Sequence, residues 1–158
     1  MGLRRVDIGA GASGSLWLAS MPGHFETWAE FCACSKAARL DLVLCLTPRD
    51  EVALGAPAYH RAIVEGTLPF RWLNAPMRNY GLPEDLPAFQ DAIGHVVAAL
   101  RGGESVLLHC AAGIGRTGTA AACVLKRLGS TKESALERVR RAGSNPENAL
   151  QSGLVDRF

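Results

Sequence analysis

Short apolar runs alternate with amphipathic stretches along the whole chain. Residues 41–46 are apolar after the first position, a pattern typical of a strand buried on both faces of a sheet. Similar short runs, followed by turn-forming residues, predict further strands. The predicted strands lie at residues 15–19, 41–46, 70–75 and 105–109.

Between these strands, apolar side chains recur at helical spacing, as at Phe25, Trp28 and Phe31. Ser130 with Glu133 forms a capping box that predicts the start of the last helix. Helices are predicted at residues 25–39, 59–64, 86–100, 119–128 and 130–143. The alternation predicts an α/β fold whose central, mostly parallel sheet has about four to five strands flanked by helices.

Composition limits the size and class of the protein. The chain has 158 residues, of which 48% are hydrophobic and 20% charged, so disordered and low-complexity classes are excluded. A chain of this length can bury one core but hardly two. We therefore expect a single domain over residues 1–158.

Charge and cysteine content narrow the expected partners and compartment. The 17 basic and 15 acidic residues give a net charge of +2, too balanced for a general binder of nucleic acid or membrane surfaces. No apolar run is long enough to span a bilayer, and the N-terminus does not have the pattern of a signal peptide. Five cysteines, an odd number, are not spaced like a disulfide framework. We expect a cytoplasmic monomer with no membrane partner, and with no nucleic-acid partner unless as a substrate.

The stretch most informative about function runs from His109 to Gly118, between a predicted strand and a predicted helix. Gly113 and Gly115 let the chain curl so that backbone N–H groups point inward. Such a nest at a helix N-terminus binds anions, and phosphate is the natural ligand. We call residues 110–116 the phosphate loop.

Cys110 begins this loop and Arg116 ends it. The positive helix end, the surrounding N–H groups and Arg116 all favour a thiolate at Cys110. The planar guanidinium of Arg116 suits bidentate contact with phosphate oxygens. A thiolate facing a bound phosphate indicates nucleophilic phosphoryl transfer through a cysteinyl-phosphate.

Other interpretations of the same residues fit less well. Gly113–Gly118 matches the dinucleotide fingerprint, but the acidic residue expected about 20 positions later is replaced by Arg138. A Walker A loop would need a Gly-Lys-Ser/Thr sequence, which is absent. A buried structural cysteine beside a surface arginine does not explain the ordered run of strand, His-Cys, glycines, Arg-Thr and helix.

The sequence His-Cys-x5-Arg-Thr resembles the signature of the cysteine-based protein tyrosine and dual-specificity phosphatases. The resemblance is to the compact single-domain members and covers nearly the whole chain, including residues 17–23, which resemble their opening strand and turn. The central position of the cysteine excludes the low-molecular-weight class. The resemblance implies a metal-independent enzyme with no cofactor.

The resemblance also implies a role for each matching residue. Cys110 would be the nucleophile, and Arg116 would bind the phosphate and the transition state. Thr117 would hydrogen-bond the departing thiolate, and His109 would orient the loop and help to keep Cys110 ionised. Gln151 falls near the glutamine with which some members position water. The phosphate-binding groups would be the backbone N–H groups of Ala111, Ala112, Gly113, Ile114, Gly115 and Arg116.

The general acid is where the chain departs from the family pattern. Members protonate the leaving oxygen with an Asp on a loop some 30 residues before the cysteine, and here Asn79 stands at that position, where it can only position substrate or water. Asp85 or Glu84 can supply the acid from the same loop, and we favour Asp85. The alternatives are that Asp85 caps the following helix, or that the enzyme works without a strong acid.

The sequence thus predicts a protein tyrosine or dual-specificity phosphatase whose substrates are phosphorylated proteins or small phosphomonoesters. Phosphotyrosine is expected first among the protein substrates, followed by phosphoserine and phosphothreonine. Ala111, Ala112 and Ile114 are uncharged, which argues mildly against the highly anionic inositol phosphates. The alternatives are a phosphatase of a non-protein substrate (a nucleotide, an RNA end or a phosphoinositide) and, from another class, a phosphate-binding pseudophosphatase with little turnover.

Overall fold

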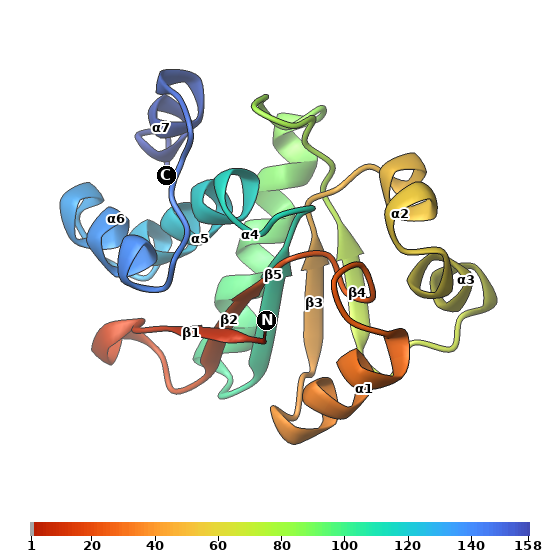
Figure 1. Ribbon diagram of the computed structural model, residues 1–158. Coiled ribbons are helices and arrows are strands. Elements are labelled where there is room, and N and C mark those ends of the chain that lie inside the picture. The colour runs from red at the N-terminus through yellow and green to blue at the C-terminus, as the bar shows by residue number, and fades with distance from the viewer. Residues whose placement is uncertain (1) are drawn as a thin grey trace.

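The computed structural model describes residues 2–158 and contains a five-stranded, mostly parallel sheet (Figure 1). The strands are β1 (Arg4–Val6), β2 (Ser15–Ala19), β3 (Leu42–Cys45), β4 (Arg71–Asn74) and β5 (Ser105–His109). Their order across the sheet is β1-β2-β5-β3-β4, and only β1 runs antiparallel to its neighbour. The predicted α/β fold with a mostly parallel sheet is confirmed.

Strand β5 lies at the centre of the sheet and leads to the phosphate loop. Leu107 is opposite Trp17 of β2 on one side and Val43 of β3 on the other. All residues of β5 are buried, as expected for a central parallel strand covered on both faces. The carboxyl ends of β2, β3 and β5 therefore meet at one edge of the sheet, where ligands of open α/β folds bind.

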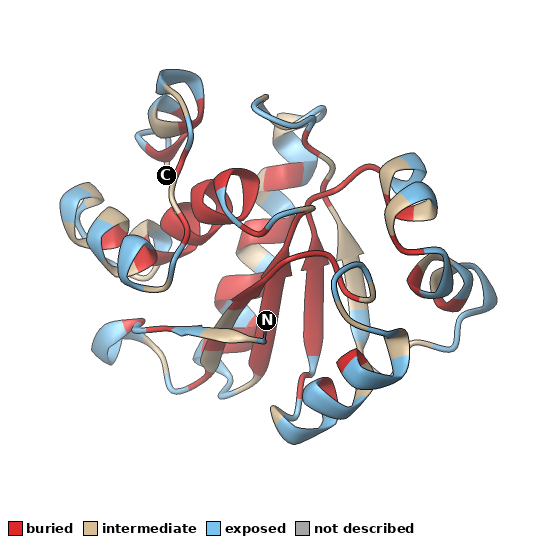
Figure 2. Cartoon of the chain, viewed as in Figure 1, coloured by how far each residue is buried: buried red, intermediate tan, exposed pale blue. Residues whose placement is uncertain are grey.

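Helices cover both faces of the sheet (Figures 1 and 2). They are α1 (Trp28–Ala37), α2 (Arg49–Gly55), α3 (Pro57–Glu65), α4 (Leu86–Arg101), α5 (Gly115–Arg127), α6 (Lys132–Arg141) and α7 (Ala149–Val155), with a 3-10 turn at Gly9–Gly11. Alternate residues of β5 point to opposite faces: Val106 and Leu108 pack with α4 and α5, whereas Leu107 packs with Phe31 of α1. Figure 2 shows that burial is concentrated in the central strands and in α5.

Several predicted boundaries are wrong, for local reasons. Helix α5 begins at Gly115 rather than after Gly118, so the end of the phosphate loop is already helical. Helix α1 begins only at Trp28, because the Thr27 hydroxyl accepts a hydrogen bond from the Glu30 N–H and caps the helix there.

The last predicted helix, α6, also begins one residue later than expected. Thr131, not Ser130, is its N-cap, and its hydroxyl accepts from the Ser134 N–H at 3.2 Å. Three elements were not predicted at all, namely β1, α2 and α7. Two of them, β1 and α2, carry side chains that reach the phosphate loop.

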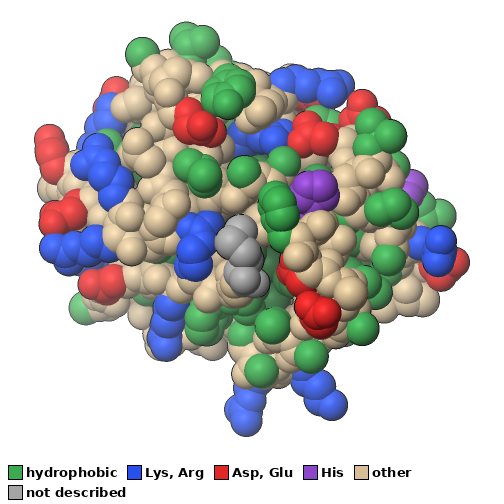
Figure 3. Space-filling model, viewed as in Figure 1, with side chains coloured by type: hydrophobic (Ala, Val, Ile, Leu, Met, Phe, Trp, Pro, Cys, Tyr) green, Lys and Arg blue, Asp and Glu red, His purple; other side chains and the backbone are tan. Residues whose placement is uncertain are grey.

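No helix within residues 2–158 combines the length and the apolar character that crossing a bilayer requires. On the face shown in Figure 3, basic and acidic side chains are interspersed. This distribution agrees with the nearly balanced charge of the sequence.

Candidate active site

The phosphate loop is held in a tight curl around the sulfur of Cys110. Cys110 is 3% exposed, and the Gly113 N–H donates to its Sγ at 3.3 Å. Gly113 has φ +76°, and a Cβ there would lie 2.6 Å from the carbonyl carbon of Ala19. Only glycine satisfies both the backbone angle and the close approach to the end of β2. The Met21 N–H, which donates to the Ala111 carbonyl at 2.9 Å, fixes the other side of the curl.

The end of the loop is the N-terminus of α5. The first N–H groups of a helix have no acceptor within the helix, so those of Gly115 and Arg116 are available to an anion. Gly118 allows the helix to pack closely on the chain that follows α6, because a Cβ there would meet the Asn145 nitrogen at 2.4 Å. The Asn145 N–H in turn donates to the Ile114 carbonyl at 3.1 Å. The sequence thus places a helix dipole and free N–H groups beside Cys110.

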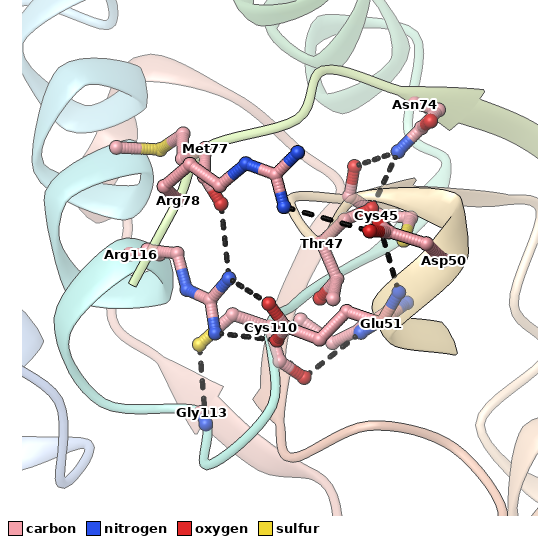
Figure 4. A network of polar contacts seen from close by, with 11 residues as sticks. Cys45, Thr47, Asp50, Glu51, Asn74, Met77, Arg78, Cys110, Gly113 and Arg116 are labelled. Carbon is pink, nitrogen blue, oxygen red and sulfur yellow. Dashed lines mark hydrogen bonds and ion pairs between the residues drawn. The ribbon is translucent and has the colours of Figure 1, made fainter. Parts of the chain in front are cut away.

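The side chain of Arg116 is 2% exposed and is held in one orientation (Figure 4). Its Nη1 donates to the Met77 carbonyl at 2.9 Å, and its two terminal nitrogens donate to the Glu51 carboxylate at 2.9 and 3.3 Å. Its Nε is buried and has no partner among residues 2–158. The two terminal nitrogens therefore fix the guanidinium, and the Nε–H remains able to donate to a ligand.

Glu51 is a site residue that the sequence analysis missed. It lies on α2, directly after β3, and Asn74 braces the turn before it by donating to the carbonyls of Cys45 and Thr47 at 2.9 and 3.0 Å. An acidic residue just beyond the carboxyl end of a central strand is a signal that could have identified it. Its position explains how the buried charge of Arg116 is balanced.

His109 is fully buried and belongs to a chain of hydrogen bonds. The Trp72 Nε1–H donates to the Tyr59 hydroxyl at 2.8 Å, and that hydroxyl lies 2.8 Å from Nε2 of His109. The Nδ1 atom is 3.2 Å from the Cys110 carbonyl. Burial lowers the pKa of His109 to about 4, so the ring is neutral at pH 7. Its contribution to the predicted ionisation of Cys110 must therefore come through hydrogen bonds rather than through charge.

Thr117 is fully buried, and its hydroxyl has no partner among residues 2–158. It lies in the first turn of α5, beside the end of the phosphate loop. A buried hydroxyl without a partner costs about 1–3 kcal/mol, so an occupant of the loop would gain from pairing with it.

The loop between β4 and α4 carries the candidates for the general acid. Asn79 and Asp85 are both exposed. Asp85 is the N-cap of α4, and its Oδ1 accepts from the Ala88 N–H at 3.0 Å. The Glu84 carboxylate pairs with Nε of Arg78 at 3.0 Å. Both acids of this loop are thus engaged in local contacts.

Gln151 is fully buried within α7. Its Oε1 accepts from the Glu147 N–H at 2.9 Å, and its Nε2 donates to the Gly81 carbonyl at 3.2 Å. Both ends of its amide are therefore bound to backbone. In this structure Gln151 ties α7 to the loop between β4 and α4.

Within residues 2–158, no three His, Cys, Asp or Glu side chains are grouped so that they could hold a metal ion. The loop instead presents nitrogen and hydroxyl donors around a sulfur. Such a donor set fits a phosphate ester, since phosphate oxygens accept hydrogen bonds and the sulfur can attack phosphorus.

Comparisons with known proteins agree with this geometry. Residues 14–152 match the sequence profile of PTP-SAK, described as "Swiss Army Knife protein, DSP-PTPase phosphatase domain". The chain belongs to this family. It is a cysteine-based, metal-independent phosphatase of the dual-specificity superfamily. No curated protein sequence matches the chain significantly.

Solved structures of phosphatases share the fold of this DSP-PTPase domain. Kinase-associated phosphatase with its catalytic cysteine replaced by serine has a TM-score of 0.85 and 17% identity, with 100% of this chain and 93% of that chain covered. PTPMT1 in complex with PI(5)P has a TM-score of 0.76 and 16% identity, covering 100% and 94%. The core catalytic domain of the PP-IP phosphatase SIW14 from S. cerevisiae has a TM-score of 0.65 and 17% identity, covering 98% and 84%.

The structure brings most of the predicted site residues of this phosphatase domain together. Cys110, Arg116 and Thr117 lie in the phosphate loop or the first turn after it, and His109 lies directly before it. The exposed Asn79 and Asp85 lie on the neighbouring loop, and the buried Gln151 binds that loop from α7.

The buried imidazole of His109 should make stability depend on pH. Its folded-state pKa of about 4 lies below the ordinary histidine pKa of 6.5, so between these values the unfolded chain binds the extra proton. We expect the free energy of unfolding to fall by roughly 3 kcal/mol from this group as the pH drops through that window. Urea denaturation of the wild type and of His109→Gln, from pH 7 to pH 4, measures it. If the free energy of unfolding depended on pH equally in the two proteins, His109 would not be the group responsible.

Removal of the Glu51 carboxylate should release the Arg116 side chain. We expect Glu51→Ala to lower kcat/KM on an aryl phosphate by roughly 10- to 100-fold, because the guanidinium loses two of its three fixed contacts. Asp50→Asn is the matched control, since Asp50 is an exposed neighbour that pairs with Arg78 at 3.6 Å and accepts from the Glu51 N–H at 3.0 Å. Asparagine keeps that acceptor and removes the charge. If both variants lost the same activity, the effect would belong to α2 as a whole.

Proposed function

We propose that the protein hydrolyses phosphomonoesters through a cysteinyl-phosphate formed on Cys110. The observation that carries the proposal is the unused, buried Nε of Arg116 at the end of the phosphate loop. A buried donor without a partner is costly, and an oxyanion in the loop would satisfy it. The unpaired hydroxyl of Thr117 and the Gly113 N–H that points at the sulfur support the same conclusion.

The proposed reaction has two displacements at phosphorus. In the first, the Cys110 thiolate forms a bond to phosphorus, and the ester oxygen leaves with its electron pair and takes up a proton from water. In the second, water attacks the phosphorus, the sulfur leaves as a thiolate, and inorganic phosphate is released. Arg116 and the loop N–H groups would stabilise the charge on the phosphoryl oxygens in both steps. Thr117 would donate to the sulfur as it leaves.

We infer an aryl phosphomonoester, with phosphotyrosine first among protein substrates. The side chains of Ala111, Ala112 and Ile114 add no charge to the loop. Arg78, the cation on the adjacent loop, is already paired with Asp50 and Glu84. PTPMT1 with PI(5)P and the PP-IP phosphatase SIW14 share the fold. The phosphate loop and the loop that carries Arg78 therefore offer few unpaired cations to bind the additional phosphates of such polyanionic ligands.

The kind of leaving group that the protein can release depends on whether the candidate acids can protonate it. Asn79 cannot donate a proton, and Asp85 is engaged as the N-cap of α4. Phenolic esters need protonation less than alkyl esters, because phenoxide is the better leaving group. The N-cap contact therefore supports turnover of aryl esters without a strong acid, and a general-acid role for Asp85 stays a hypothesis.

We propose a monomer that works in the cytoplasm. All five cysteines are free thiols, including Cys110, which must stay reduced to act as a nucleophile. The alternative from another class, a phosphate-binding module with little turnover, is suggested by the Asn at position 79 and is decided by the measurement that follows.

Replacement of the nucleophile should abolish turnover. We expect Cys110→Ser to reduce hydrolysis of p-nitrophenyl phosphate by at least about 10⁴-fold, because serine stays un-ionised and is a poor nucleophile without an adjacent base. Wild-type turnover should be unchanged by EDTA. Cys34→Ser, which alters an exposed thiol on α1, should keep full activity. Activity in Cys110→Ser, loss with EDTA, or no wild-type turnover would each contradict the proposal.

The general acid is tested by the ratio of aryl to alkyl phosphate hydrolysis. Asp85→Asn keeps a side chain that can cap α4 but removes the acid. We expect the ratio of kcat/KM values to stay unchanged, since the Asp85 carboxylate is already engaged as the N-cap of α4 in the wild type. A fall of 10²–10⁴-fold in the alkyl rate alone would instead identify Asp85 as the acid. Glu84→Gln, measured in the same way, tests the other acid of this loop, which pairs with Arg78.

A further inference from the structure

Arg4 on β1 reaches the outside of the phosphate loop, although 109 positions separate it from Gly113. Its Nη2 donates to the Gly113 carbonyl at 2.6 Å, and its Nη1 donates to the Ser144 hydroxyl at 2.9 Å and to the Ala142 carbonyl. The Ser144 hydroxyl also donates to the Gly113 carbonyl, at 2.6 Å. A single loop carbonyl thus accepts two hydrogen bonds, one of them from a charged group.

These contacts fix the direction of a peptide group in the loop. The carbonyl of Gly113 and the N–H of Ile114 belong to one planar trans peptide and point in opposite directions. When the carbonyl is held outward by Arg4 and Ser144, the Ile114 N–H must point to the inner side of the curl. That N–H is one of the predicted phosphate-binding groups, so Arg4 helps to orient the phosphate cradle from behind.

Arg4 also brings a positive charge that no acid neutralises. Among residues 2–158, the carboxylates form no ion pair with Arg4, whereas Arg116 is paired with Glu51. Burial lowers the pKa of Arg4, and the charge on Cys110 acts in the opposite direction. Gly113 links the two groups: its carbonyl accepts from Arg4 at 2.6 Å, and its N–H donates to the Cys110 sulfur at 3.3 Å. The Arg4 charge therefore lies close behind that sulfur, where a cation stabilises negative charge.

The other groups that face Cys110 cannot supply this charge. Arg116 shares its charge with Glu51, and His109 is neutral at pH 7. Burial raises the pKa of Cys45 to about 12, so that neighbouring thiol is neutral and adds no negative charge that would oppose a thiolate at Cys110. Arg4 is therefore the cation near the loop whose charge is least compensated.

We propose that Arg4 is a positioning residue of the phosphatase site. It directs the Ile114 N–H into the phosphate loop and stabilises negative charge on Cys110 and on bound phosphate. The proposal rests on the proposed function, because it assigns Arg4 a part in generating the nucleophile. It also makes the short strand β1 part of the active site rather than only an edge of the sheet.

The test is the pH dependence of Cys110 alkylation by iodoacetamide, followed by mass spectrometry of the peptide that contains Cys110. This readout needs no turnover, so it stands even if the proposed function fails. We expect Arg4→Met to raise the midpoint of alkylation by about one pH unit. Arg4→Lys, which keeps the charge but loses the fork, should restore the midpoint. Arg5→Met is the matched control, because Arg5 is an exposed neighbour on β1 that lies over Trp17.

Steady-state kinetics distinguish the two effects of Arg4, the orientation of the loop peptide and the stabilisation of negative charge. We expect Arg4→Met to lower kcat on p-nitrophenyl phosphate roughly tenfold or more, and Arg4→Lys to recover only part of that loss, because one ammonium cannot replace the paired contacts of the guanidinium. Ser144→Ala, which removes the neutral donor, should lower kcat without moving the alkylation midpoint.

Two results would overturn the proposal. One is an unchanged alkylation midpoint in Arg4→Met. The other is a midpoint that shifts equally in Arg4→Met and Arg4→Lys, since the charge would then not be the cause. If Arg4→Met lowered only the thermal stability and left kcat and the alkylation midpoint unchanged, Arg4 would stabilise the fold without acting on the site. Activity retained by Cys110→Ser would refute the proposed function without bearing on the alkylation result.

Discussion

A guanidinium group removed from water must find acceptors for its N–H groups and a partner for its charge, and this requirement organises the site around Arg116. The Glu51 carboxylate and the Met77 carbonyl meet it on the outer nitrogens. They come from segments that follow β3 and β4, so both strands must be in register before the side chain is held. The braced turn at Thr47 serves the same arrangement, since it sets where α2 begins.

The same site leaves other polar groups unpaired. The Nε of Arg116 and the hydroxyl of Thr117 are buried without partners, at a cost of about 1–3 kcal/mol each. A protein selected for stability alone would pair or replace them. Their retention makes sense if the loop is complementary to an anion that is present only during turnover, because preorganised donors need not rearrange when charge develops. The same unpaired donors thus lower the stability of the fold and supply hydrogen bonds to the proposed anion.

Much of this site follows from residues close together in the sequence. Strands β2 and β5 have the predicted bounds, since each is a compact apolar run between turns. Cys110 and Arg116 were predicted because the phosphate loop between them is short and brings its own ends together. Helix α2 was not predicted. Pro48 stands at its N-cap, where a missing N–H is harmless. Glu51 and Arg4 reach the loop through the order of strands in the sheet. For Glu51 the end of the preceding strand is a local signal, whereas for Arg4 no local pattern indicates the contact.

The position of β5 has a consequence for how the active site comes into being. It lies between β2 and β3 but follows both in the chain, so those two strands cannot be joined into one sheet until it inserts. Strand pairings over such separations are slow to form, because loop closure precedes the gain in contacts. Arg4 then meets Ala142 and Ser144 across 138 and 140 positions. The phosphate loop is held by these long-range contacts, so during synthesis on the ribosome it cannot be complete before residues 142–144 have been made.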